Sequence, residues 1–274
     1  MEPKSIAVII IFGTFPVLYL LEFLSGRLSR SRVPIKDFFF TIAGFLSQTI
    51  ISGSLLGGLL GYITVTFFSD YAGYLSSIPF LPAFLVLFFT NEFMHYWVHR
   101  KAHEWRWLWK VHRTHHSAED LNIGVLYRYN IFWVILLPHT WTGAFAVYFG
   151  LGGPFILAVL ITYFINAATH TSFRWDLYLR KRFPSSEHFW KVIERYITLP
   201  DTHHAHHAFG DNAHPNGNYA ISVFFFDTFF GTAKIPNARQ ANYGLPISPR
   251  LPWKEEIFWP LIREDLLPKT NEKM

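Results

Sequence analysis

The sequence HYWVHRKAHEWRWLWKVHRTHHS, residues 95 to 117, constrains the fold more than any other stretch of the chain. On an α-helix, residues three and four positions apart share one face, so His99 and His103 can reach a common metal ion. His95, four residues before His99, extends this row, and a second set of histidines at helical spacing ends the stretch. The pattern therefore predicts helices that present imidazoles to a shared centre.

Two further clusters share a tighter spacing. Each has histidines at positions i, i+3 and i+4, which project as a fan from one helical turn. They are His112, His115, His116, His203, His206 and His207. Neutral imidazole is the commonest metal ligand in proteins, and one ion accepts only about four to six such groups. The eight to ten imidazoles in and beside these clusters therefore imply two metal ions, and a pair of ions flanked by helices suits O2 activation better than structural bracing.

Surface exposure, metal storage and several common catalytic motifs fit the clusters less well. Solvent-exposed histidines would require three independent coincidences of spacing, and metal-storage proteins crowd histidines into repetitive tracts, which this chain lacks. A zinc protease needs H-E-x-x-H, but Trp107 stands where its second histidine would be. The serine-hydrolase elbow, the Walker loop and the dinucleotide fingerprint are also absent. Because the chain has no cysteine, nitrogen and oxygen must hold any metal ion.

The composition predicts an all-α integral membrane protein. Hydrophobic residues make up 51% of the chain and charged residues only 16%, which is low for a soluble domain. Apolar runs of spanning length cover residues 5–23, 38–68 and 78–98, and the stretch 131–170 is long enough for two more spans. The first run, interrupted only by Glu22, predicts an uncleaved anchor. We expect about four to five transmembrane helices with a histidine-rich helical cap.

The distribution of Lys and Arg predicts the side of the membrane on which the histidines lie. Basic residues crowd the loop between residues 27 and 36, whereas residues 69–77 and 150–154 contain none. By the positive-inside rule, the first loop is cytoplasmic. Two crossings later the first two clusters return to that side, and a hairpin through residues 131–170 brings the third cluster there too. All three clusters can therefore meet on the cytoplasmic side of a multi-pass protein.

The net basic charge favours contact with anionic lipid headgroups over nucleic acid. The pI is near 9.3, but the basic residues border apolar runs and form no separate basic domain. Nucleic acid is therefore not expected as a partner.

These motifs resemble those of the membrane-bound fatty acid hydroxylase and sterol desaturase superfamily, whose signature is one H-x3-H box and two H-x2-H-H boxes. The boxes read here HRKAH, HRTHH and HHAHH, and NYAISVFFFDTFFGT is similar to the superfamily's closing pattern. Within the superfamily, HRKAHE and HHSAEDLN are most similar to the alkylglycerol monooxygenase branch. Phe226 stands where the superfamily usually has Trp, and Ala220 where it often has Gly.

The resemblance implies a di-iron enzyme that uses O2 to hydroxylate or desaturate a lipid such as a fatty acyl chain, an alkyl lipid or a sterol. The ligands it implies are the eight box histidines and one histidine after the hairpin: His99, His103, His112, His115, His116, His170, His203, His206 and His207. Zinc can replace iron in an all-histidine site. Electrons must come from a separate electron-transfer protein or reductant. The expected partners are therefore the lipid substrate, membrane lipids and this electron donor.

Five further residues near the boxes are expected either to bind the metal ions or to support the ligands: His95, Glu92, His204, Asn218 and Asp227. His95 and Glu92 continue the helical row of His99, whereas His204 points away from its neighbours on a helix. Carboxylates are the expected partners of the ring N–H groups, among them Glu104, Glu119 and Asp201. A lipid slot is expected to be lined by Trp97, Trp107, Trp109, Phe173 and Trp175.

The chain is expected to divide into three parts. Residues 1–77 form a membrane anchor of two spans, residues 78–234 a fatty acid hydroxylase-type catalytic domain, and residues 235–274 an interfacial tail. The alternative hypothesis is a histidine-rich membrane metal transporter or metal-binding accessory protein. Such a protein would carry its acidic or histidine ligands inside the spans, where few occur: Glu22, Glu92, His95 and His139.

Overall fold

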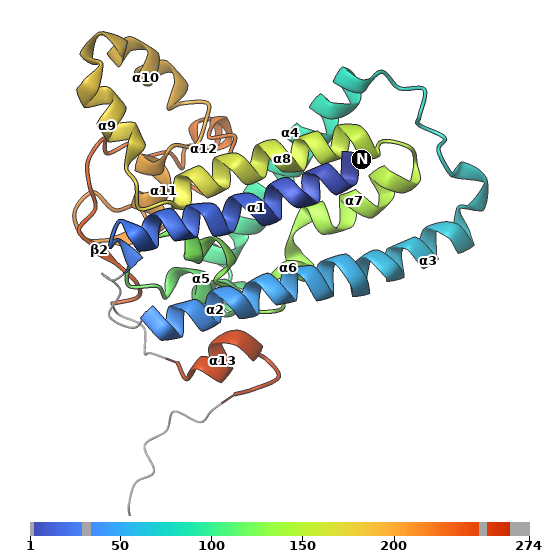
Figure 1. The fold of residues 1–274 in the computed structure, drawn as a ribbon, viewed down its shortest axis with the longest axis horizontal. Coiled ribbons are helices and arrows are strands. Elements are labelled where there is room, and N and C mark those ends of the chain that lie inside the picture. The colour runs from blue at the N-terminus through green and yellow to red at the C-terminus, as the bar shows by residue number, and fades with distance from the viewer. Residues whose placement is uncertain (1–2, 29–33, 247–250, 264–274) are drawn as a thin grey trace, which may run out of the picture.

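Long helices lying side by side form one half of the molecule (Figure 1). The computed structural model describes residues 3–28, 34–246 and 251–263. The long helices are α1 (Pro3–Leu24), α2 (Pro34–Ser47), α3 (Gly57–Phe67), α4 (Phe80–Glu104) and α8 (Gly152–His170). The π-helical segment η2 (Gln48–Leu56) joins α2 to α3, so these three elements form one continuous path. Helix α8 packs against both α1 and α4.

Short helices cluster at the end of the bundle where α4 and α8 finish (Figure 1). They are α5 (Arg106–His116), η4 (Ile123–Tyr127), α9 (Trp175–Arg182), η5 (Pro184–Ser186), α10 (Glu187–Ile193), α11 (Pro200–His207), α12 (Phe225–Phe230) and α13 (Trp253–Phe258). The strands β1 (Ala208–Phe209) and β2 (Asn242–Tyr243) pair antiparallel, with Ala208 opposite Tyr243. Three elements lie outside this cluster: η3 (Ser69–Tyr71), α7 (Pro138–Tyr148) and α6 (Trp133–Leu136), which contacts η2 and α7. The described part of the chain is thus almost entirely helical, as the sequence predicts.

The helices differ in how well they suit a bilayer. Within the described ranges, α8 alone is both long and apolar enough to cross a membrane by length and composition. The hairpin predicted within residues 131–170 is present, and Gly150 turns it with a φ of 92°. Its first limb, α7, has only eleven residues. At a rise of 1.5 Å per residue, α7 is about 16 Å long and does not cross a 30 Å hydrocarbon core.

Glu22 ties the first helix to the histidine end of the molecule. Its side chain is fully buried, and its two oxygens accept hydrogen bonds from the backbone N–H groups of Ile123 (2.8 Å) and Ser172 (2.5 Å). These donors lie at the start of η4 and just after α8. The one charge in the first apolar run is therefore a structural link between α1, η4 and the segment after α8.

The core lies where α2, η4 and α8 meet. Ile123 and Val134 are fully buried there, with Ala167 of α8 packed in the same cluster. Gly44 lets α2 approach η4 closely, because a Cβ atom at this position would lie 1.6 Å from the carbonyl oxygen of Tyr127. The packing of α2, η4 and α8 therefore positions the neighbouring segments that carry the histidines.

Candidate metal centre

Nine histidines gather into two adjacent groups. In each group one ring nitrogen per residue lies within 4.8 Å of the others. The first group, here called the five-histidine group, consists of His99, His103, His112, His116 and His206. The second, the four-histidine group, consists of His115, His170, His203 and His207. These are the nine residues that the sequence and the resemblance single out, drawn from α4, α5, α8 and α11.

The structure divides the sequence boxes between the groups. On α5, His112 and His116 belong to the five-histidine group, but His115 belongs to the other. On α11, His206 separates in the same way from His203 and His207. The expectation that each cluster converges on one centre is therefore wrong for these two clusters. An i, i+3, i+4 fan is wide enough to serve two neighbouring centres.

The spacing of the nitrogens fits metal coordination. In the five-histidine group, Nε2 of His206 lies 3.0 Å from Nε2 of His99, and Nε2 of His116 lies 3.1 Å from Nε2 of His112. In the four-histidine group, Nε2 of His170 lies 3.1 Å from that of His203 and 3.4 Å from that of His115. Two nitrogens bound to one ion at about 2.1 Å would lie about 3.0 Å apart at a right angle and about 3.4 Å apart at a tetrahedral angle.

Backbone carbonyls hold the other ring nitrogen of several histidines. Nδ1 of His99 lies 2.6 Å from the carbonyl oxygen of Tyr219, and Nδ1 of His206 lies 2.7 Å from that of Gly217. Nδ1 of His115 and of His170 likewise contact the carbonyl oxygens of Arg128 and Asn166. A carbonyl can only accept, so each Nδ1 carries the proton and each Nε2 keeps a free lone pair.

Burial keeps the imidazoles neutral. It lowers the pKa well below the ordinary imidazole value for His112, His115, His116, His203, His206 and His207. Within the described ranges, several buried ring nitrogens have no hydrogen-bond partner: His103 Nε2, His112 Nδ1, His203 Nδ1 and His207 Nε2. Neutral, buried imidazoles whose ring nitrogens lie within 4.8 Å of one another form the kind of donor set that a metal ion requires.

Asp227 and Asn218 shape the loop that supplies two of the supporting carbonyls. Asp227 is fully buried and accepts hydrogen bonds from the backbone N–H groups of Tyr219 (2.8 Å) and Ala220 (2.7 Å). Asn218 donates to the carbonyl oxygens of Thr202 and Lys234, and its φ of 56° places it in the left-handed region. Burial raises the pKa of Asp227 to about 6, although its hydrogen bonds oppose this rise. Neither residue belongs to a histidine group, so both support ligands through the backbone.

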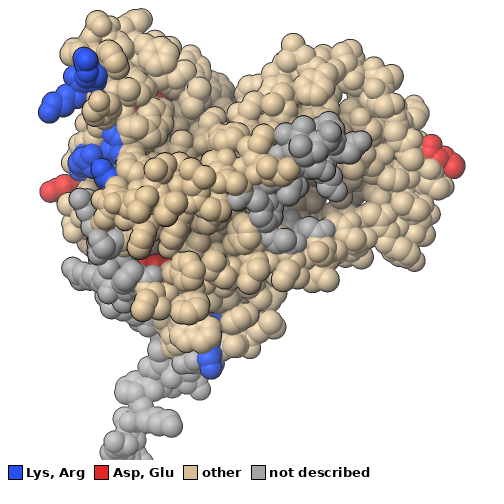
Figure 2. All heavy atoms as spheres, in the orientation of Figure 1, with Lys and Arg blue, Asp and Glu red and all other residues tan. Residues whose placement is uncertain are grey.

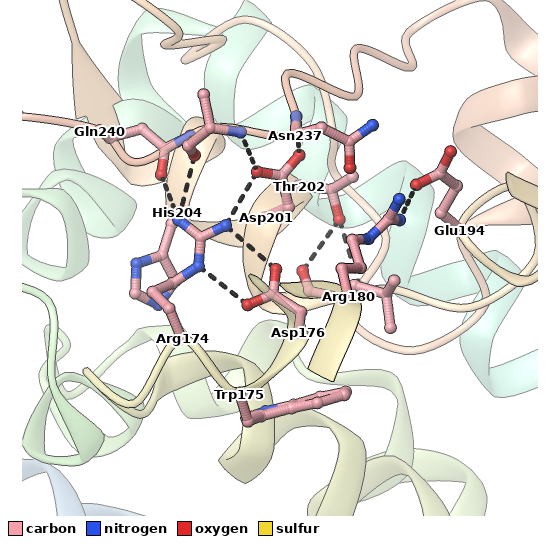
Figure 3. A network of polar contacts seen from close by, with 12 residues as sticks. Arg174, Trp175, Asp176, Arg180, Glu194, Asp201, Thr202, His204, Asn237 and Gln240 are labelled. Atoms are coloured by element: carbon pink, nitrogen blue, oxygen red, sulfur yellow. Dashed lines mark hydrogen bonds and ion pairs between the residues drawn. The ribbon is translucent and has the colours of Figure 1, made fainter. Parts of the chain in front are cut away.

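A buried ion-pair network holds α11 from its other side (Figure 3). Arg174 binds Asp176 and Asp201, and Asp201 also accepts the backbone N–H groups of Asn237 and Ala238. Next to it, Nδ1 of His204 lies 2.9 Å from the hydroxyl of Tyr243, and its Nε2 lies 3.1 Å from the carbonyl oxygen of Thr171. His204 therefore joins α11 to β2 and to the end of α8, and it faces away from both groups.

Two further carboxylate candidates, Glu92 and Glu104, have partners other than the imidazole rings. Glu92 accepts hydrogen bonds from the Thr162 hydroxyl and the Val223 backbone, and it lies outside both groups. Glu104 is bound by the side chains of Arg100 and Lys101. The expectation that carboxylates hold the ring N–H groups is wrong for these residues, as it is for Asp201. Backbone carbonyls hold these ring N–H groups instead, and because every residue has a carbonyl, the residue types in a sequence do not show which ones accept.

An apolar cavity of about 430 Å³ leads to both groups. Its lining includes histidines of both groups, His99, His112, His115, His170 and His203, and also His95, which lies one turn before His99. None of the five aromatic residues expected to line a slot contributes to it. Trp97 instead meets Phe230 edge to face, and Trp175 lies beside Trp190. The aromatic residues that line the cavity are Phe45, Phe88, Tyr127, Tyr129, Trp133 and Tyr163.

One cavity residue has no signal in the sequence motifs. Asn166 lies on α8 one turn before His170 and lines the cavity. In the described part of the chain its Oδ1 is buried without a hydrogen-bond partner, so its carboxamide is available to a ligand. Only the spacing of four residues from His170 could have suggested it.

Comparison with known proteins gives the same family as the motifs. The fatty acid hydroxylase family model matches residues 84–232, more than half of the chain. Similar curated proteins include alkylglycerol monooxygenases from Xenopus tropicalis (29% identical over 180 residues, 62% of this chain and 35% of the relative) and Homo sapiens (29% over 166 residues, 58% and 32%). A third, from Danio rerio, is 28% identical over 175 residues, 60% of this chain and 34% of the relative.

This chain spans about a third of the length of these relatives. No solved structure matches it. The resemblance to the superfamily and to its alkylglycerol monooxygenase-like branch is confirmed. From the extent of the family match, the chain belongs to the fatty acid hydroxylase family.

Proposed function

We propose that this protein is a membrane-bound di-iron oxygenase that uses O2 to hydroxylate, or to desaturate, the hydrocarbon chain of a lipid. The observation that carries the proposal is the apolar cavity whose lining includes histidines of both groups. A cavity of about 430 Å³ lies within the range of ligand sites, and its apolar wall suits a hydrocarbon chain. Family membership and the alkylglycerol monooxygenase relatives support a lipid as the substrate.

The two groups would each hold one iron ion. Nine imidazoles and no sulfur ligand suit iron and also accept zinc. Two iron ions, with O2 and external electrons, supply the oxidant needed to attack an unactivated C–H bond. The chain's own part is to fix the ring nitrogens through backbone carbonyls, to exclude water, and to place one lipid carbon beside His99, His115 and His170.

The distribution of charged side chains supports a membrane setting. On the face shown in Figure 2, most Lys and Arg side chains lie towards the end of the molecule that carries α9 and α10, one lies at the lower edge, and the described residues across the wide middle are almost all uncharged. We place that middle in the bilayer and the histidine groups on the cytoplasmic side of a multi-pass protein. Residues 78–234 would form the catalytic unit, with residues 1–77 as anchor and residues 235–274 as an interfacial tail. A separate protein or reductant would deliver electrons from the cytoplasm.

The test is to express the protein in iron-replete cells, measure metal per chain by mass spectrometry, and compare lipid extracts with those from cells that carry His207→Ala. His188→Ala is the matched control, because His188 is exposed and lies outside both groups. We expect two irons per chain, and lipids heavier by one oxygen or lighter by two hydrogens. The product should disappear with His207→Ala and persist with His188→Ala.

Two outcomes would contradict the proposal. If the His207→Ala protein inserts normally and still oxidises lipid, the four-histidine group is not part of the active site. If the wild-type protein binds metal, transports it into proteoliposomes and leaves lipids unchanged, the metal transporter or accessory role replaces the enzyme.

A further inference from the structure

Helix α12 exposes large aromatic side chains on its outer face. Phe229 is 68% exposed and Phe225 is 40% exposed, and Tyr196, stacked on Phe225, is 53% exposed. The opposite face of α12 is anchored in the protein by Asp227, which is fully buried. The exposed rings therefore do not result from a loosely packed helix. We call Tyr196, Phe225 and Phe229 the α12 aromatic surface.

This surface continues onto the outer face of α4. Phe226 and Phe230, both half-buried, lie between the α12 aromatic surface and Phe93 of α4, with ring centroids of 5.6 Å and 6.3 Å to Phe93. Phe93 is itself 41% exposed. One apolar surface thus runs from the helix bundle onto the short helices. A contiguous exposed apolar surface of this kind marks contact with a partner or with a membrane.

Basic and tryptophan side chains border the surface on the side away from the bundle. The guanidinium of Arg100 lies 5.2 Å from the ring centre of Trp97, and the ammonium of Lys101 lies 5.6 Å from that of Trp105, which is half-exposed. Arg195, next to Tyr196, is exposed. Tryptophan rings concentrate at the headgroup level of membranes, and long basic side chains extend from apolar surfaces to reach phosphates.

We propose that the α12 aromatic surface lies in the boundary between headgroups and acyl chains of the leaflet nearest the histidines, and that Arg195 contacts anionic headgroups there, with Arg100 and Lys101, which also pair with Glu104, at the same border. The occupant is a bilayer because the surface is continuous with α4 and because the cations follow the aromatic rings in the order that a leaflet requires, acyl chains first and phosphates next. The inference rests on contacts of α12 and α4 and does not depend on the chemistry of the metal centre.

The chain has no cysteine, so a single introduced cysteine reports one position. Full-length Phe229→Cys and, separately, Phe225→Cys would carry an environment-sensitive fluorophore. Asp211→Cys, in an exposed polar loop, is the matched control. Each protein is reconstituted into phosphatidylcholine vesicles with or without phosphatidylglycerol. Fluorescence is then quenched either by nitroxide-labelled lipid or by aqueous iodide.

We expect the labels at 225 and 229 to be quenched by nitroxide lipid and protected from iodide, and the label at 211 to behave in the opposite way. Phosphatidylglycerol should strengthen the lipid quenching at 229, and this gain should be lost in Arg195→Gln. Iodide quenching at 225 and 229 equal to that at 211 would overturn the proposal and leave the surface to a protein partner. Equal lipid quenching with and without phosphatidylglycerol would overturn the headgroup contact. Metal content and gel-filtration profile, measured for each variant, show whether it is folded.

Discussion

Replacing Asp227 by asparagine is expected to weaken metal binding in one histidine group and spare the other. The carboxylate holds the backbone N–H groups of Tyr219 and Ala220 and the hydroxyl of Thr232. The loop that it shapes supplies the carbonyls of Tyr219 and Gly217, which hold His99 and His206. Both histidines belong to the five-histidine group.

The size of the effect follows from the contacts. In Asp227→Asn one oxygen becomes an NH2 group, so at least one buried donor loses its acceptor, which costs about 1–3 kcal/mol of folding free energy. Supporting contacts of metal-bound histidines are worth about 10- to 100-fold in metal affinity, or about 1.4–2.7 kcal/mol. We therefore expect a folded protein whose five-histidine group binds metal about 10- to 100-fold more weakly.

The assay is metal per chain after dialysis against a graded chelator. Wild-type protein should retain two ions at a chelator concentration where Asp227→Asn retains one. Glu104→Gln is the control, because Glu104 adjoins His103 but contacts only Arg100 and Lys101. Equal retention in Asp227→Asn and wild type, or equal loss from both groups, would refute the reasoning that the loop acts on the five-histidine group alone.

Three further outcomes are expected. Gly44→Ala should lower the free energy of unfolding by about 1–3 kcal/mol or more, because the new Cβ meets the backbone of Tyr127. Gly61→Ala, which has open space around its Cβ position, should be neutral or stabilising by up to about 1 kcal/mol. Thermal unfolding in detergent compares the two variants. Glu22→Leu leaves two buried N–H groups without an acceptor and should cost about 2–6 kcal/mol in the same measurement, and an unchanged midpoint would show that the link is dispensable. In metal-free protein the buried imidazoles, whose pKa values lie below that of the unfolded chain, take up protons only on unfolding. Stability should therefore be constant above about pH 6.5 and fall below it by up to about 1.4 kcal/mol per pH unit for each imidazole, and a flat profile from pH 7.5 to 5.5 would contradict this account.

The helical character and the nine gathered histidines were predictable from periodicity and motif. Helical spacing places His99 and His103 on one face of α4, and the resemblance adds His170, which lies far away in sequence but joins the four-histidine group. The division of each fan between two groups was not predictable, because it depends on how the histidine rings of α5 and α11 meet. No local pattern encodes the relative placement of two helices that are distant in sequence.

The residues that line the cavity could not be predicted from the sequence either. Tryptophans adjacent to the boxes were expected to line it, but neighbours in sequence on a helix point in different directions, and Trp107 is 55% exposed. The wall comes instead from segments such as Phe45 of α2, Tyr127 of η4 and Trp133 of α6, which reach the histidines through packing. Hydrophobic periodicity predicts that such residues are buried, but it does not predict which residues they pack against.

The carbonyls that hold His99, His115, His170 and His206 have a consequence for how this family can be studied by mutagenesis. An alanine substitution at Tyr219 removes a phenol but leaves its main-chain oxygen in place, so a side-chain scan would score that position as unimportant to the imidazole tautomer. Replacing the amide between Tyr219 and Ala220 by an ester would weaken the acceptor for His99 and remove the donor to Asp227 in a single atom change. In this centre the path of the main chain determines which ring nitrogen of each of these histidines carries the proton. Testing that role directly requires a change to the backbone itself.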